Sequence, residues 1–367
     1  MWPRVSPSLH FLALGFIVAL GLAVWTGHGE ARSSIETTVG APPQEVSSSA
    51  LDAYVRGLAH LNEPSSDSTA LAIEALREAT DLAPTFGKAW AGLAQAYAQD
   101  FDMGPEHSPK VLERARAAAR HAVTLEPEHV GALCSMGFVE LLSYRDWSSA
   151  GQWFEKAVAL DPTSVRGWQG TTWMRLAEGR VEEAHTAARR SYLLAPDNAD
   201  VVNTIAMTLF VLDRPEEALA VLRSARERGV EFEVGPLTLQ SSIEAHLGQW
   251  EAAKATYLEM LTVLNRPGSE SIQLEAIFNE QGFDAMSRHV VELLPELSHL
   301  TRAVRLVHLQ DIEGALDILE EGARIEGWDM FLVGIHPGFR PLDGNPRYES
   351  IVADLQLGRP QRDSGKE

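Results

Sequence analysis

The sequence predicts an all-α protein, an α-solenoid in which antiparallel helix pairs wind into a right-handed superhelix. Two independent markers recur along the chain. Prolines that end helices stand at Pro84, Pro127, Pro162 and Pro196, at steps of 43, 35 and 34 residues. Small residues of the second helices keep the same register, and self-similarity at such a period indicates a helical repeat. These small residues are Ala72, Ala115, Ala150, Ala184, Ala218 and Ala253.

The first segment, residues 1–29, is predicted to be a signal or membrane anchor. No Asp, Glu, Lys or Arg occurs from Val5 to Gly29. The apolar run of residues 9–26 lies between the lengths typical of a signal-peptide core and of a spanning helix, so both alternatives stay open. Arg4 precedes the run, and the positive-inside rule then places the following chain outside the cytoplasm.

These features predict a protein of the cell envelope. An uncleaved anchor would make it a single-pass inner-membrane protein that contacts the membrane through residues 9–26, and a cleaved signal would make it periplasmic or secreted. Residues 30–50 contain Ala41-Pro42-Pro43 and a run of three serines, which is typical of a flexible linker.

Residues 51–326 are predicted to form the repeat array, with about seven units. In one unit, Trp168, Gly179, Ala184 and Pro196 occupy the large, turn, small and terminal positions, and residues 90–97 read W-x2-L-A-x2-Y. The small residues allow close helix packing, the glycine permits a tight turn, and the proline stops the second helix. The array therefore resembles the tetratricopeptide family.

Two departures from the period indicate local changes in the array. The step of 43 residues predicts an insertion near residues 100–109. The interval from Ala253 to Ala315 is six residues short of two periods, which predicts a degenerate unit near residues 268–298.

Residues 327–357 are predicted to cap the array, followed by a disordered tail at residues 358–367. Residues 336–348 read HPGFRPLDGNPRY. This phrase is similar to the ending of the periplasmic tetratricopeptide regions of membrane-spanning winged-helix regulators and adenylate cyclases, and residues 52–57 are similar to their opening. The DNA-binding or catalytic output domain of those proteins has no counterpart in this sequence.

The composition argues against several kinds of chemistry. The net charge of −20 disfavours nucleic acid as a partner, because phosphates are bound by clustered Lys and Arg. Cys134 is the single cysteine, which rules out an intramolecular disulfide, and it is predicted to be a core residue. The sequence holds no nucleophile elbow, phosphate-binding loop, dinucleotide motif or paired-histidine zinc motif. We therefore predict no enzymatic activity, no cofactor and no metal site.

The predicted function is that of a protein-interaction adaptor, which binds a protein or peptide in the concave groove lined by the first helices of the units. Trp173 would supply an aromatic anchor there. An alternative function is that of the sensor half of a split transmembrane regulator. An enzyme is the least favoured hypothesis. The predicted groove residues are Lys88, Gln95, Gln99, Arg166, Gln169, Trp173, Asn203, Thr204 and Thr208.

Overall fold

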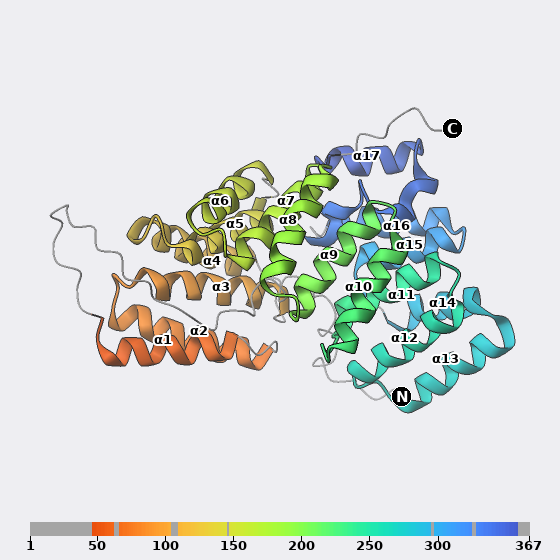
Figure 1. Ribbon diagram of the computed structural model, residues 1–367, viewed down its shortest axis with the longest axis horizontal. Coiled ribbons are helices and arrows are strands. Elements are labelled where there is room, and N and C mark those ends of the chain that lie inside the picture. Colours follow the sequence, from red (N-terminus) through yellow and green to blue (C-terminus); the bar gives the residue numbers. More distant parts are fainter. Residues whose placement is uncertain are drawn as a thin grey trace, which may run out of the picture.

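The computed structural model describes residues 46–61, 66–103, 109–144, 147–294, 297–324 and 328–358. All regular structure within these ranges is helical, which confirms the all-α prediction (Figure 1). The predicted signal or anchor of residues 1–29, most of the linker and residues 359–367 of the tail lie outside the described residues. Within the described ranges no helix is both long enough and apolar enough to span a membrane.

The described helices α1 to α16 form eight successive pairs, and each pair packs its two helices against one another. A short C-terminal set follows them. The bounds are α1 Ser48–Leu61, α2 Ser66–Leu82, α3 Gly87–Met103, α4 Pro109–Leu125, α5 Val130–Tyr144, α6 Trp147–Leu160, α7 Val165–Ala177, α8 Val181–Leu194, α9 Ala199–Val211, α10 Pro215–Glu227, α11 Val234–His246, α12 Trp250–Val263, α13 Gly268–Gln281, α14 Phe283–Leu293, α15 His299–His308, α16 Ile312–Arg324, η3 Trp328–Leu332, η4 Pro337–Leu342 and α17 Pro346–Asp354.

The helix ends follow from the marker residues of the sequence. Each of the four marker prolines stands two residues beyond the end of a second helix, where proline cannot continue the helix. The following helix starts on a polar cap in two of these units. Ser164 Oγ accepts the backbone N–H of Gly167, and Asn198 Oδ1 accepts those of Asp200 and Val201. An α-solenoid of successive helix pairs is therefore what this periodicity builds.

The array differs from the predicted one in its count and in its insertion. The described residues form eight pairs instead of about seven, and α1 already begins within the predicted linker. The pair α13 and α14 falls within residues 268–298, the range predicted for a degenerate unit. Residues 100–103 form the last turn of helix α3 and not a loop, so part of the predicted insertion lengthens this helix. Residues 104–108 lie outside the described residues.

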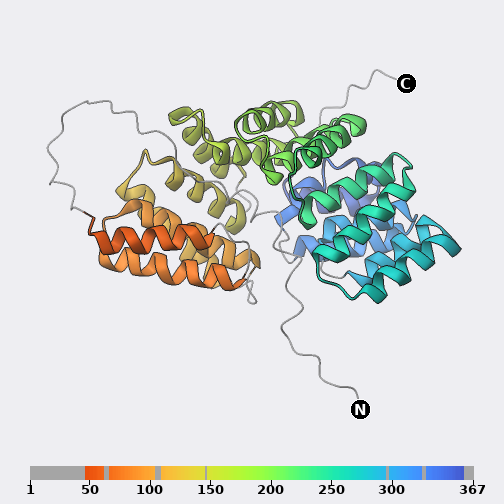
Figure 2. The same ribbon diagram turned by 60° about the horizontal axis from the view of Figure 1, so that its bottom comes forward.

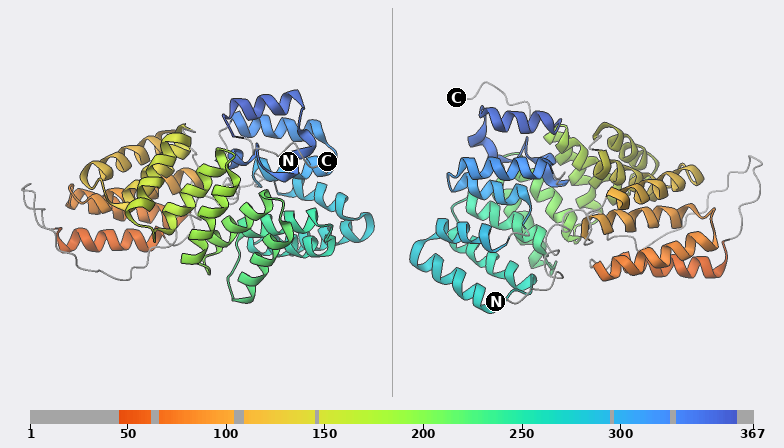
Figure 3. Two further views of the ribbon diagram at one scale, coloured as in Figure 1. Left: turned by 45° about the horizontal axis from the view of Figure 1, so that its top comes forward. Right: turned by 180° about the vertical axis from the view of Figure 1, so that it is seen from behind.

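The C-terminal segment, residues 328–358, returns to the middle of the array. The pairs follow an arc from α1 to α14, and α15 to α17 lie beside the middle helices (Figures 1, 2 and 3). The Gly358 N–H donates to the Ala177 carbonyl across 2.8 Å. One hydrophobic cluster joins α5 to α8 with α15 to α17, and Cys134 is buried in it as predicted. The segment therefore caps the last pair and also closes back onto the concave side of α7.

A second contact holds the returning segment at the turn between α9 and α10. Asp213 adopts a φ of 63° at the turn position that Gly179 and Gly248 occupy in neighbouring units. Asp adopts this left-handed conformation less readily than glycine, so the presence of Asp at this turn needs an explanation. Its carboxylate lies 3.0 Å from Nη1 of Arg340 in η4. The pair ties the C-terminal segment to a point 127 residues earlier in the chain.

Candidate functional site

The predicted aromatic anchor of the groove is a core residue. Trp173 is 6% exposed, and its ring meets that of Phe331 edge to face, with centroids 5.6 Å apart. Phe331 belongs to η3 of the C-terminal segment. The prediction that Trp173 is presented to a partner is therefore wrong, because the chain's own C-terminal segment occupies that part of the concave side.

Two predicted groove residues are bonded to each other. Arg166 Nη1 on α7 donates to Gln95 Oε1 on α3 across 2.7 Å, and the Arg166 guanidinium lies over the ring of Phe138 at 5.4 Å from its centroid. Burial lowers the pKa of Arg166 from its ordinary value. This bond bridges two first helices across the intervening α5, so Arg166 links repeats in addition to facing the concave side.

The remaining predicted residues are dispersed. Lys88 is exposed, whereas Gln99, Gln169 and Thr204 are buried. Thr208 on α9 lies 3.0 Å from His185 Nδ1 on α8, so it is buried between two successive helix pairs and is not a groove residue. Of the nine predicted residues, only Asn203 lines one of the two cavities described below.

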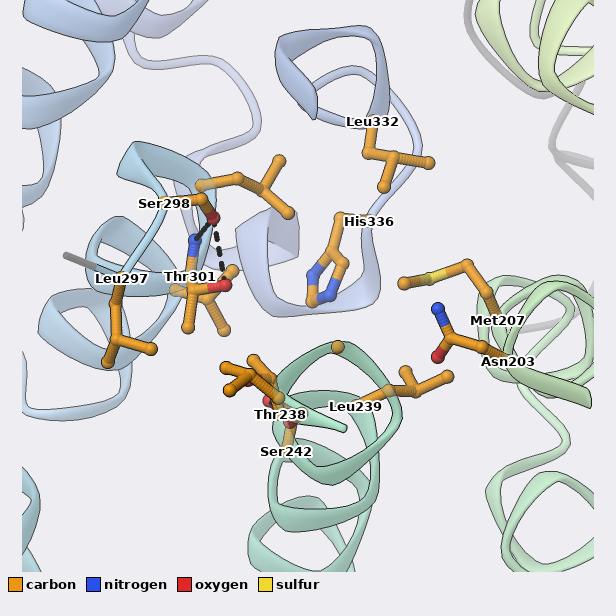
Figure 4. Close-up of a pocket in the computed structure, with 14 residues that line it drawn as sticks. Asn203, Met207, Thr238, Leu239, Ser242, Leu297, Ser298, Thr301, Leu332 and His336 are labelled. Atoms are coloured by element: carbon orange, nitrogen blue, oxygen red, sulfur yellow. Dashed lines mark hydrogen bonds between the residues drawn. The ribbon is translucent and has the colours of Figure 1, made fainter. Parts of the chain in front are cut away.

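The concave side of the C-terminal half encloses a chamber with a narrow and a wide part. The narrow part, about 60 Å³, lies between α9, α11, α15 and the C-terminal segment (Figure 4). The wide part, about 330 Å³, extends past α12 and α14 to η4. Ser242, Val304 and His336 line both parts. We use the name chamber for these two adjacent cavities, which share three lining residues.

His336 stands where the two parts meet and is held as a neutral ring. Its Nδ1 accepts the Gly338 N–H across 3.0 Å, so the ring proton is on Nε2. Figure 4 shows the ring directed into the narrow part. Burial, followed by the charges of His246 and Arg340, lowers the pKa of His336 to about 3. His336 therefore offers a hydrogen-bond donor throughout the physiological range of pH.

This pKa predicts how stability depends on pH. The unfolded chain binds the His336 proton near its ordinary pKa of 6.5 and the folded chain near 3, so the unfolded state holds more protons between these values. The free energy of unfolding then falls by up to about 1.4 kcal/mol for each unit by which the pH drops through this window. His336→Asn keeps a side-chain acceptor for Gly338 and should lose this slope.

The measurement is urea unfolding of both proteins at about pH 7 and about pH 4.5. The difference between the stability losses of the two proteins cancels the contribution of the other titrating groups. These groups include the carboxyl of Asp200, whose pKa is raised by burial. Equal losses of stability in wild type and His336→Asn would contradict a buried neutral His336.

Arg305 is the least satisfied side chain of the wide part. It is 5% exposed, and Nε, Nη1 and Nη2 all lack hydrogen-bond partners. The guanidinium lies over the ring of Tyr257, 4.6 Å from its centroid. Burial lowers the pKa of Arg305, and the phenol of Tyr257 opposes this shift. A buried cation without an acceptor is costly, so this group is a candidate for ligand contact.

The lining of the chamber has a charge opposite to that of the whole chain. The chain carries −20, yet no Asp or Glu is found among the described residues that line either part of the chamber. The wide part brings together Arg305, Arg340 and three histidines. Its rim reaches solvent, where the side chains of His308 and Arg340 are 41% and 42% exposed. Both rim cations are paired, Arg340 with Asp213 and His308 with Asp284, which leaves Arg305 as the cation of the described lining for which no carboxylate partner is found.

The sequence marks Asn203, gives no signal for Arg305, and gives only an indirect signal for His336. Arg305 occurs as an ordinary basic residue in the last turn of a helix. Its burial depends on Tyr257 and on the returning C-terminal segment, which are far from it along the chain. His336 belongs to the tail phrase that resembles other tetratricopeptide regions, and this phrase was the one signal that could have directed attention to it.

The comparisons with known proteins give no family for this chain. No protein-family profile and no curated protein matches it. Among solved structures, it is similar to PilW, a widely conserved type IV pilus biogenesis factor, at 17% identity and a TM-score of 0.47 over 59% of this chain and 94% of that chain. It is similar to Pseudomonas aeruginosa PilF at 20% identity and a TM-score of 0.44, over 62% of this chain and 97% of that chain. It is also similar to TTC0263, a thermophilic TPR protein of Thermus thermophilus, at 14% identity and a TM-score of 0.44, over 54% of this chain and 98% of that chain. At these scores the likenesses carry no argument about what this chain binds.

Proposed function

We propose that this protein is a non-enzymatic adaptor that binds an extended peptide segment of a partner protein in the chamber. One observation carries the proposal: two residues that line the chamber on the concave side have buried polar atoms that the chain itself does not satisfy. These are Oδ1 of Asn203 and the three guanidinium nitrogens of Arg305. Such groups cost stability in the free protein, and a ligand that satisfies them recovers that cost on binding.

The lining favours a peptide over a compact polar ligand. The narrow part is lined by apolar side chains such as Met207, Leu239 and Leu332 and also by amide and hydroxyl groups. An extended peptide presents backbone amides and alternating side chains to such a surface. The helices α9, α11 and α15 each contribute to the wall, so one bound segment would contact several units at once.

We also propose that the array acts outside the cytoplasm. The uncharged apolar run of residues 9–26 supports this localisation, and the two routes to it are an uncleaved anchor and a cleaved signal. N-terminal sequencing of the protein purified from its own cells distinguishes the two.

Peptide display on the full chain tests the binding function. Ser242→Trp places an indole where the two parts of the chamber meet, because Ser242 lines both. Leu193→Trp is a matched control on α8, where the side chain is 71% exposed. We expect peptides selected on the wild type to bind Leu193→Trp equally and to bind Ser242→Trp at least about ten-fold more weakly, a loss of about 1.4 kcal/mol.

The proposal fails if the selected peptides bind Ser242→Trp as well as they bind the wild type. Circular dichroism of the three proteins checks that Ser242→Trp keeps its helices. A loss of binding that accompanies a loss of helicity is resolved by Ser242→Leu, a smaller obstruction at the same position, for which a partial loss of affinity is expected.

A further inference from the structure

We infer that the wide part of the chamber binds a small planar aromatic molecule that carries a hydrogen-bond donor, as phenol and indole do. Such a ligand goes beyond the proposed function, because it is a free molecule and not a segment of a partner protein. Three features of the wide part support it: its size, the rings of its lining residues and a hydroxyl group without a partner.

The wide part has the size of a site for a small molecule. Its volume is about 330 Å³, and pockets for small ligands have volumes of about 300–1,000 Å³. Among its lining residues, Phe210, Tyr257 and Phe283 are buried, whereas His246 and His308 are exposed. The wide part therefore has a buried floor and a mouth that is open to solvent, so a small ligand can enter without unfolding of the array.

Aromatic rings are the common feature of this lining. The residues of the wide part that carry one are Phe210, His246, Tyr257, Phe283, His308 and His336. Three of these rings form a first group, on α9, α11 and the loop before η4. The ring of Phe210 meets those of His246 and His336 edge to face, with centroids 5.4 Å and 5.5 Å apart. Edge-to-face contact is a preferred geometry of aromatic pairs.

The other three rings form a second group, on α12, α14 and α15. The ring of Phe283 meets that of His308 edge to face at 6.1 Å and stacks on that of Tyr257 at 6.3 Å. Among the described residues, no ring of the second group contacts a ring of the first. Since residues of both groups line one cavity, we place the cavity between them. A flat aromatic ring bound there would contact both groups, with a pairing energy that a saturated ring of the same size does not gain.

A hydroxyl group without a partner supplies the polar contact. Ser287 on α14 lines the wide part and is 2% exposed. Its side chain forms no hydrogen bond with another described residue, although buried hydroxyl groups are normally paired. The O–H of a phenol or the N–H of an indole can donate to this oxygen. The rim cations Arg340 and His308 are already paired with carboxylates, so the mouth does not select a charged ligand.

The binding of two matched probes to the full chain tests this inference. Phenol and cyclohexanol have the same number of heavy atoms and the same hydroxyl group, but only phenol is flat and aromatic. Titrations followed by ligand-observed NMR give the affinity of each probe. We expect phenol to bind at least about five-fold more tightly than cyclohexanol, because it gains an aromatic contact with each group of rings.

Variants at the mouth locate the bound probe. His246→Ala removes a ring of the first group and His308→Ala a ring of the second, and both side chains are exposed. Each change should weaken phenol binding about two- to ten-fold and leave cyclohexanol binding unchanged. Ser287→Ala should weaken the binding of both probes, because both carry the hydroxyl group. The matched control is His60→Ala on α1, which lines neither part of the chamber and should bind phenol as the wild type does.

Equal affinities of the wild type for phenol and cyclohexanol would overturn the inference, and so would the absence of phenol binding. Phenol that binds His246→Ala and His308→Ala as tightly as the wild type would show that its site lies elsewhere. If circular dichroism shows that an alanine variant loses helices, His246→Leu or His308→Leu replaces it, since leucine keeps bulk without an aromatic ring. These results leave the adaptor function standing, because the display experiment tests it separately through Ser242→Trp.

Discussion

Substitution of Gly170 by alanine should destabilise the middle of the array by about 2 kcal/mol or more, although alanine is the better helix former. Gly170 lies within α7, and a Cβ built there would clash with Cδ1 of Phe154. Phe154 has no room to move, because its ring also meets Gly137 of α5, where a Cβ would lie 2.7 Å from Cζ. The ring fills the space between two glycines and is fully buried.

Native-state hydrogen exchange of amides in α5 to α7 measures this loss. Gly268→Ala is the matched control, because nothing lies within 4 Å of a Cβ at that exposed position. In addition, Phe154→Leu should relieve part of the clash, so the double variant Gly170→Ala/Phe154→Leu should lose less stability than the two single losses added together. If Gly170→Ala proved as stable as Gly268→Ala, the packing of Phe154 between α5 and α7 would be wrong.

Substitution of Phe331 by alanine should cost about 3–5 kcal/mol, the usual loss for a fully buried aromatic side chain. Phe331 is 1% exposed and meets Trp173 and Trp147, at centroid distances of 5.6 Å and 6.3 Å. The cavity that remains would lie between the C-terminal segment and α7. Exchange of amides in residues 328–358 should therefore accelerate together with exchange in α7.

Ile272→Ala on α13 is the control for this change, since Ile272 is 70% exposed and its truncation should alter stability by less than about 0.5 kcal/mol. A Phe331→Ala protein whose residues 328–358 exchange at the wild-type rate would show that the segment does not depend on contact with the array.

The repeat architecture could be predicted because its markers act locally. A proline ends a helix wherever it stands, and a small residue permits close packing between neighbours in the chain. Trp90 and Trp168 illustrate how far this local rule extends. Each indole N–H donates to the carbonyl of the proline six residues earlier, at 2.8 Å and 2.9 Å, so two units repeat one hydrogen bond as well as one spacing.

The site could not be predicted in the same way because its parts meet across long sequence separations. Trp173 has the position and residue type of a groove anchor, yet it is covered by Phe331, which lies 158 positions later. Periodicity says which face of a helix points to the concave side. It does not say whether that side is left open to a partner or filled by another part of the chain.

The chamber also depends on Asp213, whose role could not be predicted from the sequence. Neighbouring units have glycine at this turn position, and from the sequence alone the aspartate has no evident function there. Its pairing with Arg340 gives it a use, because this contact holds η4 across the turn of α9 and α10. The wall of the wide part includes Arg340 and Pro341. Return of the C-terminal segment is thus the feature on which the chamber depends.

Carbodiimide crosslinking of the Arg340→Lys protein tests this return most directly. The reagent joins a carboxylate to an amine in direct contact, and the chain has only five lysines of its own, so the background is low. The control is Arg347→Lys, since Arg347 pairs with Glu313, Asp317 and Glu320 of α16. We expect mass spectrometry to find a bond from Asp213 to position 340 in the first protein and from α16 to position 347 in the second. A bond to α16 in the control together with no bond to Asp213 in the Arg340→Lys protein would show that the C-terminal segment caps the last pair alone and that the chamber is not closed.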